Sequence, residues 1–192
     1  QKQQRDMMKE YMKSLKKSLS KFQPEKNNEE KKALKQRIEN NERKLQQNEE
    51  LLKELESNIT EYDFIVINLG IVDTFAHKGN LQKTVEAMEI VDTTLGQISK
   101  LVLKNNGTFI LTSDHGNAEI MYDLQTKEIF TEHTTSQVPL LIVNKDFKRT
   151  ELPIGTLADV APTVCSLLDL DVPLEMRGND LLKEYIKKDK VT

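Results

Sequence analysis

The fold class is indicated first by one stretch of sequence, Asp63-Phe64-Ile65-Val66-Ile67-Asn68-Leu69. It is a short apolar run rich in β-branched residues, which is typical of a buried strand in an α/β sheet. Apolar residues then recur at helical spacing from Leu81 to Val102, after Asn80 as a capping residue, and Asn105-Asn106-Gly107 ends that helix. Thr108 to Thr112 predicts a second strand. Strand, helix and strand in this order predict a parallel crossover.

The chain that follows continues this alternation. Val138 to Val143 predicts a third strand, and Pro139 places its start at an edge or a strand beginning. Thr156 to Asp159 resembles a capping box that opens a helix through Leu168. The sequence therefore predicts an α/β domain over residues 61–186, with a mainly parallel sheet flanked by helices.

Residues 1–60 have a different composition. They contain one proline, Pro24, and no glycine, whereas all seven glycines and all three histidines lie after residue 60. Positions that are alternately four and three residues apart form a seam on each side of the Pro24 break. The first seam is apolar throughout, at Met8, Met12, Leu15, Leu19 and Phe22. The second is apolar except for its two asparagines, at Leu34, Ile38, Asn41, Leu45, Asn48, Leu52 and Leu55. This spacing predicts an α-helical coiled-coil hairpin over residues 1–58 that makes little contact with the domain after it.

The composition of the chain limits the classes of protein to which it can belong. The chain has 192 residues, of which 37% are hydrophobic and 31% are charged, and its single cysteine, Cys165, excludes an internal disulfide. We expect no transmembrane helix, because no apolar run reaches about 18 residues, and the N-terminus has no apolar signal core. The hairpin carries charges of both signs, which argues against nucleic acid and membranes as partners and leaves self-association through the seam. A cytoplasmic protein is expected.

Five residues that suit metal binding flank the predicted strands. Asp73 and His77 follow the first strand, Asp114 and His115 follow the second, and His133 precedes the third. The carboxyl ends of parallel strands meet at one sheet edge, so the two pairs should converge, with the His133 loop reaching back over the sheet. Carboxylate and imidazole ligands together suit Mn²⁺ or Zn²⁺. A lone histidine in a loop is usually structural, so spacing alone leaves both readings open.

Longer motifs surround these five residues. Thr112-Ser113-Asp114-His115-Gly116-Asn117-Ala118-Glu119 resembles the signature of cofactor-independent (2,3-bisphosphoglycerate-independent) phosphoglycerate mutases, within the alkaline phosphatase-like superfamily. Asn68, Asp73, His77, Gly79 and Asn80 match a second stretch of that family. The resemblance continues through His133-Thr134-Thr135, Val138-Pro139, Leu157 to Thr163 and Glu175-Met176-x-Gly178, and covers about residues 61–184.

The resemblance implies two divalent ions, usually Mn²⁺, with Zn²⁺ or Mg²⁺ as alternatives. Asp73, His77 and His133 match the ligands of one ion, and Asp114 and His115 match part of the shell of the other. In the family, an aspartate and a nucleophilic serine from the N-terminal part complete the second site, and a separate domain holds phosphoglycerate. Residues 1–60 resemble neither of these, and Ser113 is not where the nucleophile lies.

The chain is therefore expected to be the C-terminal metal-binding part of a glycolytic mutase that converts 3-phosphoglycerate to 2-phosphoglycerate. We expect no catalytic residue in this part and no activity from the chain alone. Two other readings stay open on the residues. One is another metal-dependent phosphatase of the same superfamily, and the other is a non-catalytic coiled-coil interaction protein with a relict metal site.

Overall fold

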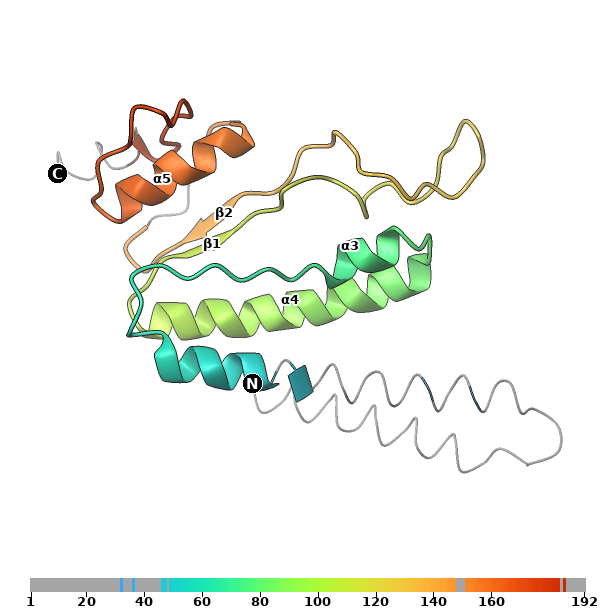
Figure 1. Ribbon diagram of the computed structural model, residues 1–192, viewed down its shortest axis with the longest axis horizontal. Coiled ribbons are helices and arrows are strands. Elements are labelled where there is room, and N and C mark those ends of the chain that lie inside the picture. The colour runs from blue at the N-terminus through green and yellow to red at the C-terminus, as the bar shows by residue number, and fades with distance from the viewer. Residues whose placement is uncertain are drawn as a thin grey trace.

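A computed structural model describes residues 32, 36, 46, 47, 49–147, 151–183 and 185 of the chain. The elements run in the order α3 (Ile71–Ala76), α4 (Leu81–Lys104), β1 (Phe109–Leu111), β2 (Leu141–Val143), the 3₁₀ turn η1 (Leu157–Asp159) and α5 (Val160–Leu167). Residues 49–58 are also helical. The two strands lie between helical layers, with α3 and α4 on one side and α5 on the other (Figure 1). Most of the predicted coiled-coil hairpin falls outside the described residues.

Helix α4 has the limits that the sequence predicts. Its N-terminus is capped by Asn80, whose side-chain oxygen accepts a hydrogen bond of 3.0 Å from the backbone N–H of Lys83. At the other end Asn106 turns to a positive φ of 59°, and the Gly107 N–H donates to the Val102 carbonyl at 3.0 Å. The residues that α4 buries fall on one stripe, namely Thr84, Ala87, Thr94 and Ile98.

A hydrophobic core joins α4 to the helical residues before it. Leu55, Ile98 and Phe109 form a buried cluster, and Leu52 packs against it together with other half-buried apolar side chains. Burying a leucine side chain stabilises a fold by about 1.5–3 kcal/mol. The expectation that residues 1–58 make little contact with the following domain is therefore wrong at the end of that segment, because Leu55 of the predicted seam turns toward the core. The boundary between residues 58 and 61 stays a prediction.

The sheet differs from the expected one. Strands β1 and β2 pair antiparallel, with Phe109 opposite Val143 and Leu111 opposite Leu141, so the prediction of a mainly parallel sheet is wrong for the described strands. A parallel pair needs a crossover connection, usually a helix. Residues 112–140, all described, contain no helix and instead run out and back as a long ribbon, which returns the chain antiparallel. The ribbon turns between Tyr122 and Ile129, which form an isolated antiparallel bridge.

The predicted first strand, residues 63–69, is extended in Figure 1 but forms no ladder with β1 or β2. Residues 63–66 are exposed, whereas Ile67 packs against the cluster of Leu55, Ile98 and Phe109. The segment leads directly into α3, whose first turn is closed by the Thr74 N–H bonding to the Gly70 carbonyl at 3.2 Å. The sequence did not predict α3, which is one short helix of six residues.

The predicted capping box forms at the start of η1 and α5. The Asp159 carboxylate accepts hydrogen bonds from the backbone N–H groups of Asn179 and Thr156, each at 2.6 Å, and these bonds hold the pKa of Asp159 below its ordinary value. The Thr163 hydroxyl lies behind them and accepts from the Leu181 N–H at 2.9 Å. The chain after Gly178 is thereby tied to α5. Within the described ranges, no helix is both long and apolar enough to span a membrane.

Candidate metal centre

Helix α3 and the residue at its C-cap, His77, place two of the five predicted ligands on one face. Asp73 and His77 are four residues apart, so their side chains lie one helical turn from each other. The His77 Nε2 and Asp73 Oδ1 atoms are 3.3 Å apart. Gly79, with a φ of 62°, and Asn80 then turn the chain into α4. The pair therefore sits on a short helix that packs on α4, and not in a loop at the end of a strand.

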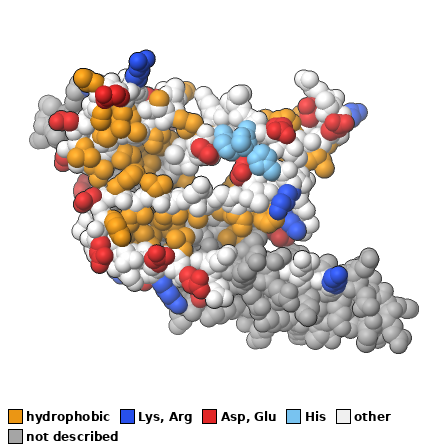
Figure 2. Space-filling model, in the orientation of Figure 1, with side chains coloured by type: hydrophobic (Ala, Val, Ile, Leu, Met, Phe, Trp, Pro, Cys, Tyr) orange, Lys and Arg blue, Asp and Glu red, His pale blue; other side chains and the backbone are white. Residues whose placement is uncertain are grey.

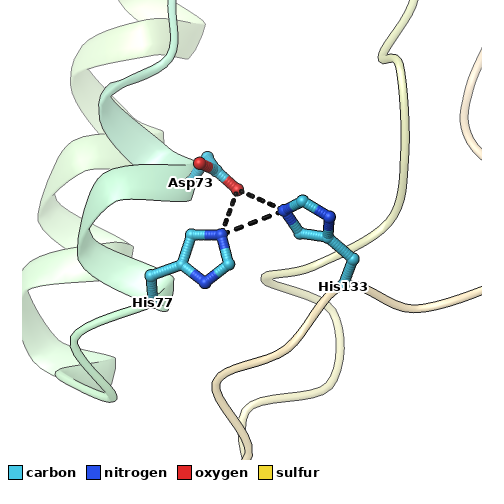
Figure 3. Close-up of side chains that lie close together, drawn as sticks. All are labelled: Asp73, His77 and His133. Atoms are coloured by element: carbon cyan, nitrogen blue, oxygen red, sulfur yellow. Dashed lines mark hydrogen bonds and ion pairs between the residues drawn. The ribbon is translucent and has the colours of Figure 1, made fainter.

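His133 comes from the ribbon and completes a group of three. Its Nε2 lies 3.0 Å from His77 Nε2 and 3.7 Å from Asp73 Oδ1, and Figure 3 shows the three side chains pointing toward a common centre. All three candidate ligand atoms fall within 4.8 Å of one another. A point equidistant from them lies about 2 Å from each, which is the length of a Zn–N or Zn–O bond. The three residues therefore fit a divalent cation.

The tautomer of His77 also fits a ligand role. Its Nδ1 is 2.6 Å from the carbonyl oxygen of Thr131, and only a protonated ring nitrogen can donate to a carbonyl. Nδ1 therefore carries the hydrogen, which leaves the lone pair of the neutral ring on Nε2, facing Asp73 and His133. This is the arrangement in which a backbone carbonyl orients a metal-binding imidazole. The sequence offered no signal for it, because any residue at position 131 would supply that carbonyl.

Asn117 connects the loop after β1 to the two ligands on α3. Its side-chain amide donates to Asp73 Oδ1 at 2.7 Å and lies 3.3 Å from His77 Nε2. Asn117 is 6% exposed, so its polar group is buried against the site. Asn117 belongs to the motif that carries Asp114 and His115, but its residue type gave no sign of this role.

Asp114 and His115 lie beside the group of three without joining it. The His115 ring stacks on the His133 ring with centroids 3.6 Å apart, and its Nε2 is 3.6 Å from Asp114 Oδ2. The Asp114 side chain is 86% exposed. Both residues border a groove of about 950 Å³ whose walls include parts of β2 and α5. Figure 2 shows the histidines gathered on one face with acidic side chains next to them.

A clamp in the ribbon holds His133 next to His115. The Thr134 N–H donates to the Gly116 carbonyl at 2.8 Å, and the Thr134 hydroxyl donates to the Glu119 carboxylate. Glu119 also accepts from the Asn117 N–H at 2.7 Å. These bonds, with that from Thr134 as the largest cause, lower the pKa of Glu119 from 4.5 to about 2. A Cβ at position 116 would meet the Thr134 hydroxyl and the Glu119 carboxylate, so a side chain there would displace the two groups that form this clamp.

The five predicted residues thus gather in one place. Asp73, His77 and His133 converge, and Asp114 and His115 lie against them, as the sequence predicted. Their convergence does not depend on parallel strands, since the sheet is antiparallel and only Asp114 and His115 follow a strand that belongs to it. His133 lies near the other four residues because the returning half of the ribbon is bridged to the outgoing half at Gly116 and Thr134.

This chain resembles known proteins at the level of family, sequence and structure. A family model described as the Metalloenzyme superfamily matches residues 9–172. The match begins well before residue 61, where the resemblance was expected to start, and so takes in most of the N-terminal segment. No resemblance of that segment had been expected from its residues.

Curated relatives carry the name that the motifs suggested. Over 134 residues the chain is 41% identical to the 2,3-bisphosphoglycerate-independent phosphoglycerate mutase of Clostridium beijerinckii, which covers 70% of this chain and 26% of that protein. The protein of the same name from Vesicomyosocius okutanii is 41% identical over 133 residues, covering 69% of this chain and 26% of its own length.

A solved structure matches as well. It is described as phosphoglycerate mutase of Leishmania mexicana at low cobalt concentration, and it superposes with a TM-score of 0.58 at 28% identity, covering 71% of this chain and 27% of that one. This likeness supports the expected alkaline phosphatase-like fold. The chain spans about a quarter of the length of the relatives it matches. The match over residues 9–172 shows that this chain belongs to the Metalloenzyme superfamily, and its relatives there include cofactor-independent phosphoglycerate mutases.

Proposed function

We propose that Asp73, His77 and His133 bind one divalent cation and that Asp114 and His115 supply part of a second site. The observation that carries this proposal is the convergence of the three ligand atoms, within 4.8 Å of one another. Two imidazole nitrogens that face each other at 3.0 Å, with a carboxylate oxygen beside them, repel unless a cation or a shared proton lies between them. Mixed imidazole and carboxylate ligands favour Mn²⁺ or Zn²⁺, with Mg²⁺ as the third candidate.

On this proposal the chain is the metal-binding part of a cofactor-independent phosphoglycerate mutase, which interconverts 3- and 2-phosphoglycerate. Bound divalent ions neutralise the charge of a phosphoryl group during its transfer. Asp73, His77 and His133 hold and orient the ion, while Asn117 and the Thr131 carbonyl fix the ligands. The groove beside Asp114 and His115 leaves that side of the site open to a phosphorylated molecule.

The chain alone should not perform the mutase reaction. Phosphoryl transfer depends mainly on positioning, and the family uses a serine nucleophile and cationic side chains for it. Ser113 is the serine nearest in sequence to the ligands, but its hydroxyl donates to the His115 carbonyl at 2.9 Å. That bond turns it to the backbone of its own loop, which supports the view that it is not the nucleophile.

Calorimetric titration of the whole chain with MnCl₂ and with ZnCl₂ tests the metal site. We expect saturable binding that His77→Ala weakens by about tenfold or more, because a lost ligand is not replaced by its neighbours. Glu132→Gln is the matched control, since this exposed carboxylate adjoins His133 without joining the cluster. A wild-type chain that takes up neither ion would refute the site.

A coupled mutase assay at saturating Mn²⁺ tests the second half of the proposal. The purified chain should show no conversion of 3-phosphoglycerate. Robust turnover by the chain alone would mean that a nucleophile lies in residues interpreted as helix or loop.

A further inference from the structure

The turn between α4 and β1 contains a reactive pair of residues. It is formed by Asn105, Asn106 and Gly107, at the end of α4 that lies away from α3 (Figure 1). Asn106 is the only asparagine of the sequence that precedes a glycine. The side-chain amide of an asparagine can be attacked by the backbone nitrogen of the next residue, and glycine obstructs this attack least because it has no Cβ. Asn106 and Gly107 are therefore suited to spontaneous modification.

The fold itself favours this pair of residues. Asn106 adopts a positive φ of 59°, which asparagine tolerates better than most residues with a side chain. A Cβ at Gly107 would lie 2.8 Å from Cγ1 of Val102, so a larger residue would crowd the turn. The two residues that close the C-terminus of α4 are thus also the two that react readily with each other.

A hydrogen bond restrains the attacking nitrogen in the folded chain. The Gly107 N–H donates to the Val102 carbonyl at 3.0 Å. Before it can attack, this nitrogen has to turn toward the Asn106 side chain, so its bond to Val102 must first open. Asn105 is held differently, because its side-chain amide donates to the Leu101 carbonyl at 2.9 Å and the residue after it carries a Cβ. Asn106 should therefore react in preference to Asn105, and only as fast as the turn opens.

A lysine lies where it can hold the product of this reaction. Lys145 follows β2 by two residues, and its Nζ donates to Oδ1 of Asn106 at 2.5 Å. Both residues are exposed. Conversion of the amide to a carboxylate places a negative charge at the C-terminus of α4, where the helix dipole disfavours it. The ammonium group of Lys145 offsets this cost, and its hydrogen bond to position 106 becomes charge-assisted.

We propose that Asn106 is a site of spontaneous deamidation, gated by the bond between Gly107 and Val102, and that Lys145 holds the carboxylate product. The Gly107 nitrogen bonds to the side-chain carbonyl carbon of Asn106, and its proton leaves with the amino group as ammonia, which gives a cyclic imide. Water then adds to one carbonyl of the ring and breaks its C–N bond. The product at position 106 is an aspartate or an isoaspartate, and the isoaspartate lengthens the backbone by a carbon atom and does not fit this turn.

Peptide mapping by mass spectrometry, on the whole chain kept at mildly alkaline pH, tests the site and its gate. We expect the mass gain of an amide converted to a carboxyl at Asn106, with Asn105 unchanged. The conversion should be slower by about tenfold or more in the folded chain than in urea, because the turn must open first. Asn106→Gly is the blank, since glycine adopts the positive φ without cost and offers no amide. Equal conversion at Asn105, or equal rates with and without urea, would refute the proposal.

A second experiment tests the role of Lys145. Asn106→Asp supplies the product directly, and the urea midpoint of its unfolding should not fall below that of the wild type. In a Lys145→Met background the same substitution should lower the midpoint, because the new charge then faces the end of α4 alone. Lys100→Met is the matched control, since Lys100 is an exposed lysine of α4 and the bond to Asn106 comes from Lys145. If Asn106→Asp lowers the midpoint equally in all three backgrounds, Lys145 does not hold the product.

Discussion

The buried side-chain amide of Asn117 donates a hydrogen bond of 2.7 Å to Asp73, across 44 residues of sequence. This contact joins the loop that follows β1 to the short helix α3. Since the same amide lies 3.3 Å from His77 Nε2, one side chain positions two of the three candidate ligands. Groups that orient metal ligands in this way contribute to affinity without touching the ion.

Replacing Asn117 should therefore weaken metal binding. We expect Asn117→Leu to lower the affinity for Mn²⁺ or Zn²⁺ by about tenfold or more, because Asp73 and His77 lose their common restraint. Isothermal titration calorimetry provides the measurement. Asn144→Leu is the control, since the Asn144 amide makes a comparable bond of 2.7 Å to the Thr108 hydroxyl away from the site. Equal affinities of the two variants would show that Asn117 does not position the ligands.

Metal binding should weaken in acid. Protons compete with the cation for His77 Nε2 and His133 Nε2, the two ring nitrogens that lie 3.0 Å apart. The apparent affinity is expected to fall as the solution is taken from about pH 7 to about pH 5, the range in which imidazoles commonly gain a proton. Titrations in buffers of different ionisation enthalpy should also detect proton release when Mn²⁺ binds at the lower pH. An affinity independent of pH would exclude imidazole ligands.

Glu119 should contribute stability that acid removes. Its pKa falls from 4.5 to about 2 on folding, chiefly because the Thr134 hydroxyl donates to it. A lowered folded-state pKa means that the stabilisation is complete above pH 4.5 and disappears as the pH falls toward 2. Glu119 is exposed, so screening by water keeps the effect small.

Urea unfolding at a series of pH values measures this contribution. The midpoint of wild-type unfolding should drop between about pH 5 and about pH 2, and the drop should be shallower in Glu119→Gln, which cannot ionise. Glu128→Gln serves as the control, because Glu128 is an exposed carboxylate of the same ribbon. If the three pH profiles run parallel, the clamp between Glu119 and Thr134 does not stabilise the fold.

Two glycine substitutions should act in opposite directions. A Cβ at Gly178 would collide with the Ala158 backbone, so Gly178→Ala should destabilise the chain by about 1–3 kcal/mol through overpacking. Gly96 lies inside α4, and apart from its own helix backbone no atom lies within 4 Å of an added Cβ. Gly96→Ala should therefore stabilise the chain by about 0.5–1 kcal/mol through helix propensity. Thermal unfolding of both variants measures the difference, and a shift of the same sign in both would contradict the packing described at Gly178.

Some features of this protein follow from local sequence. The limits of α4 depend on Asn80 and on Asn106-Gly107, and the start of η1 depends on Thr156 and Asp159, all of which act within one turn of the backbone. The five candidate ligands could also be named from the sequence, because their residue types and motifs suit metal binding and their spacing from strand-forming stretches suggested that they converge.

Other features depended on contacts distant in sequence. The antiparallel pairing of β1 with β2 arises because residues 112–140 return as a ribbon, a path that neither strand encodes. Asn117, Glu119 and the Thr131 carbonyl acquire their roles only when that ribbon folds back over α3. Helix caps and helix periodicity depend on residues that are close in sequence, so they can be recognised from the sequence alone. Strand pairing and ligand orientation depend on which distant backbone groups meet, and only the tertiary structure decides that.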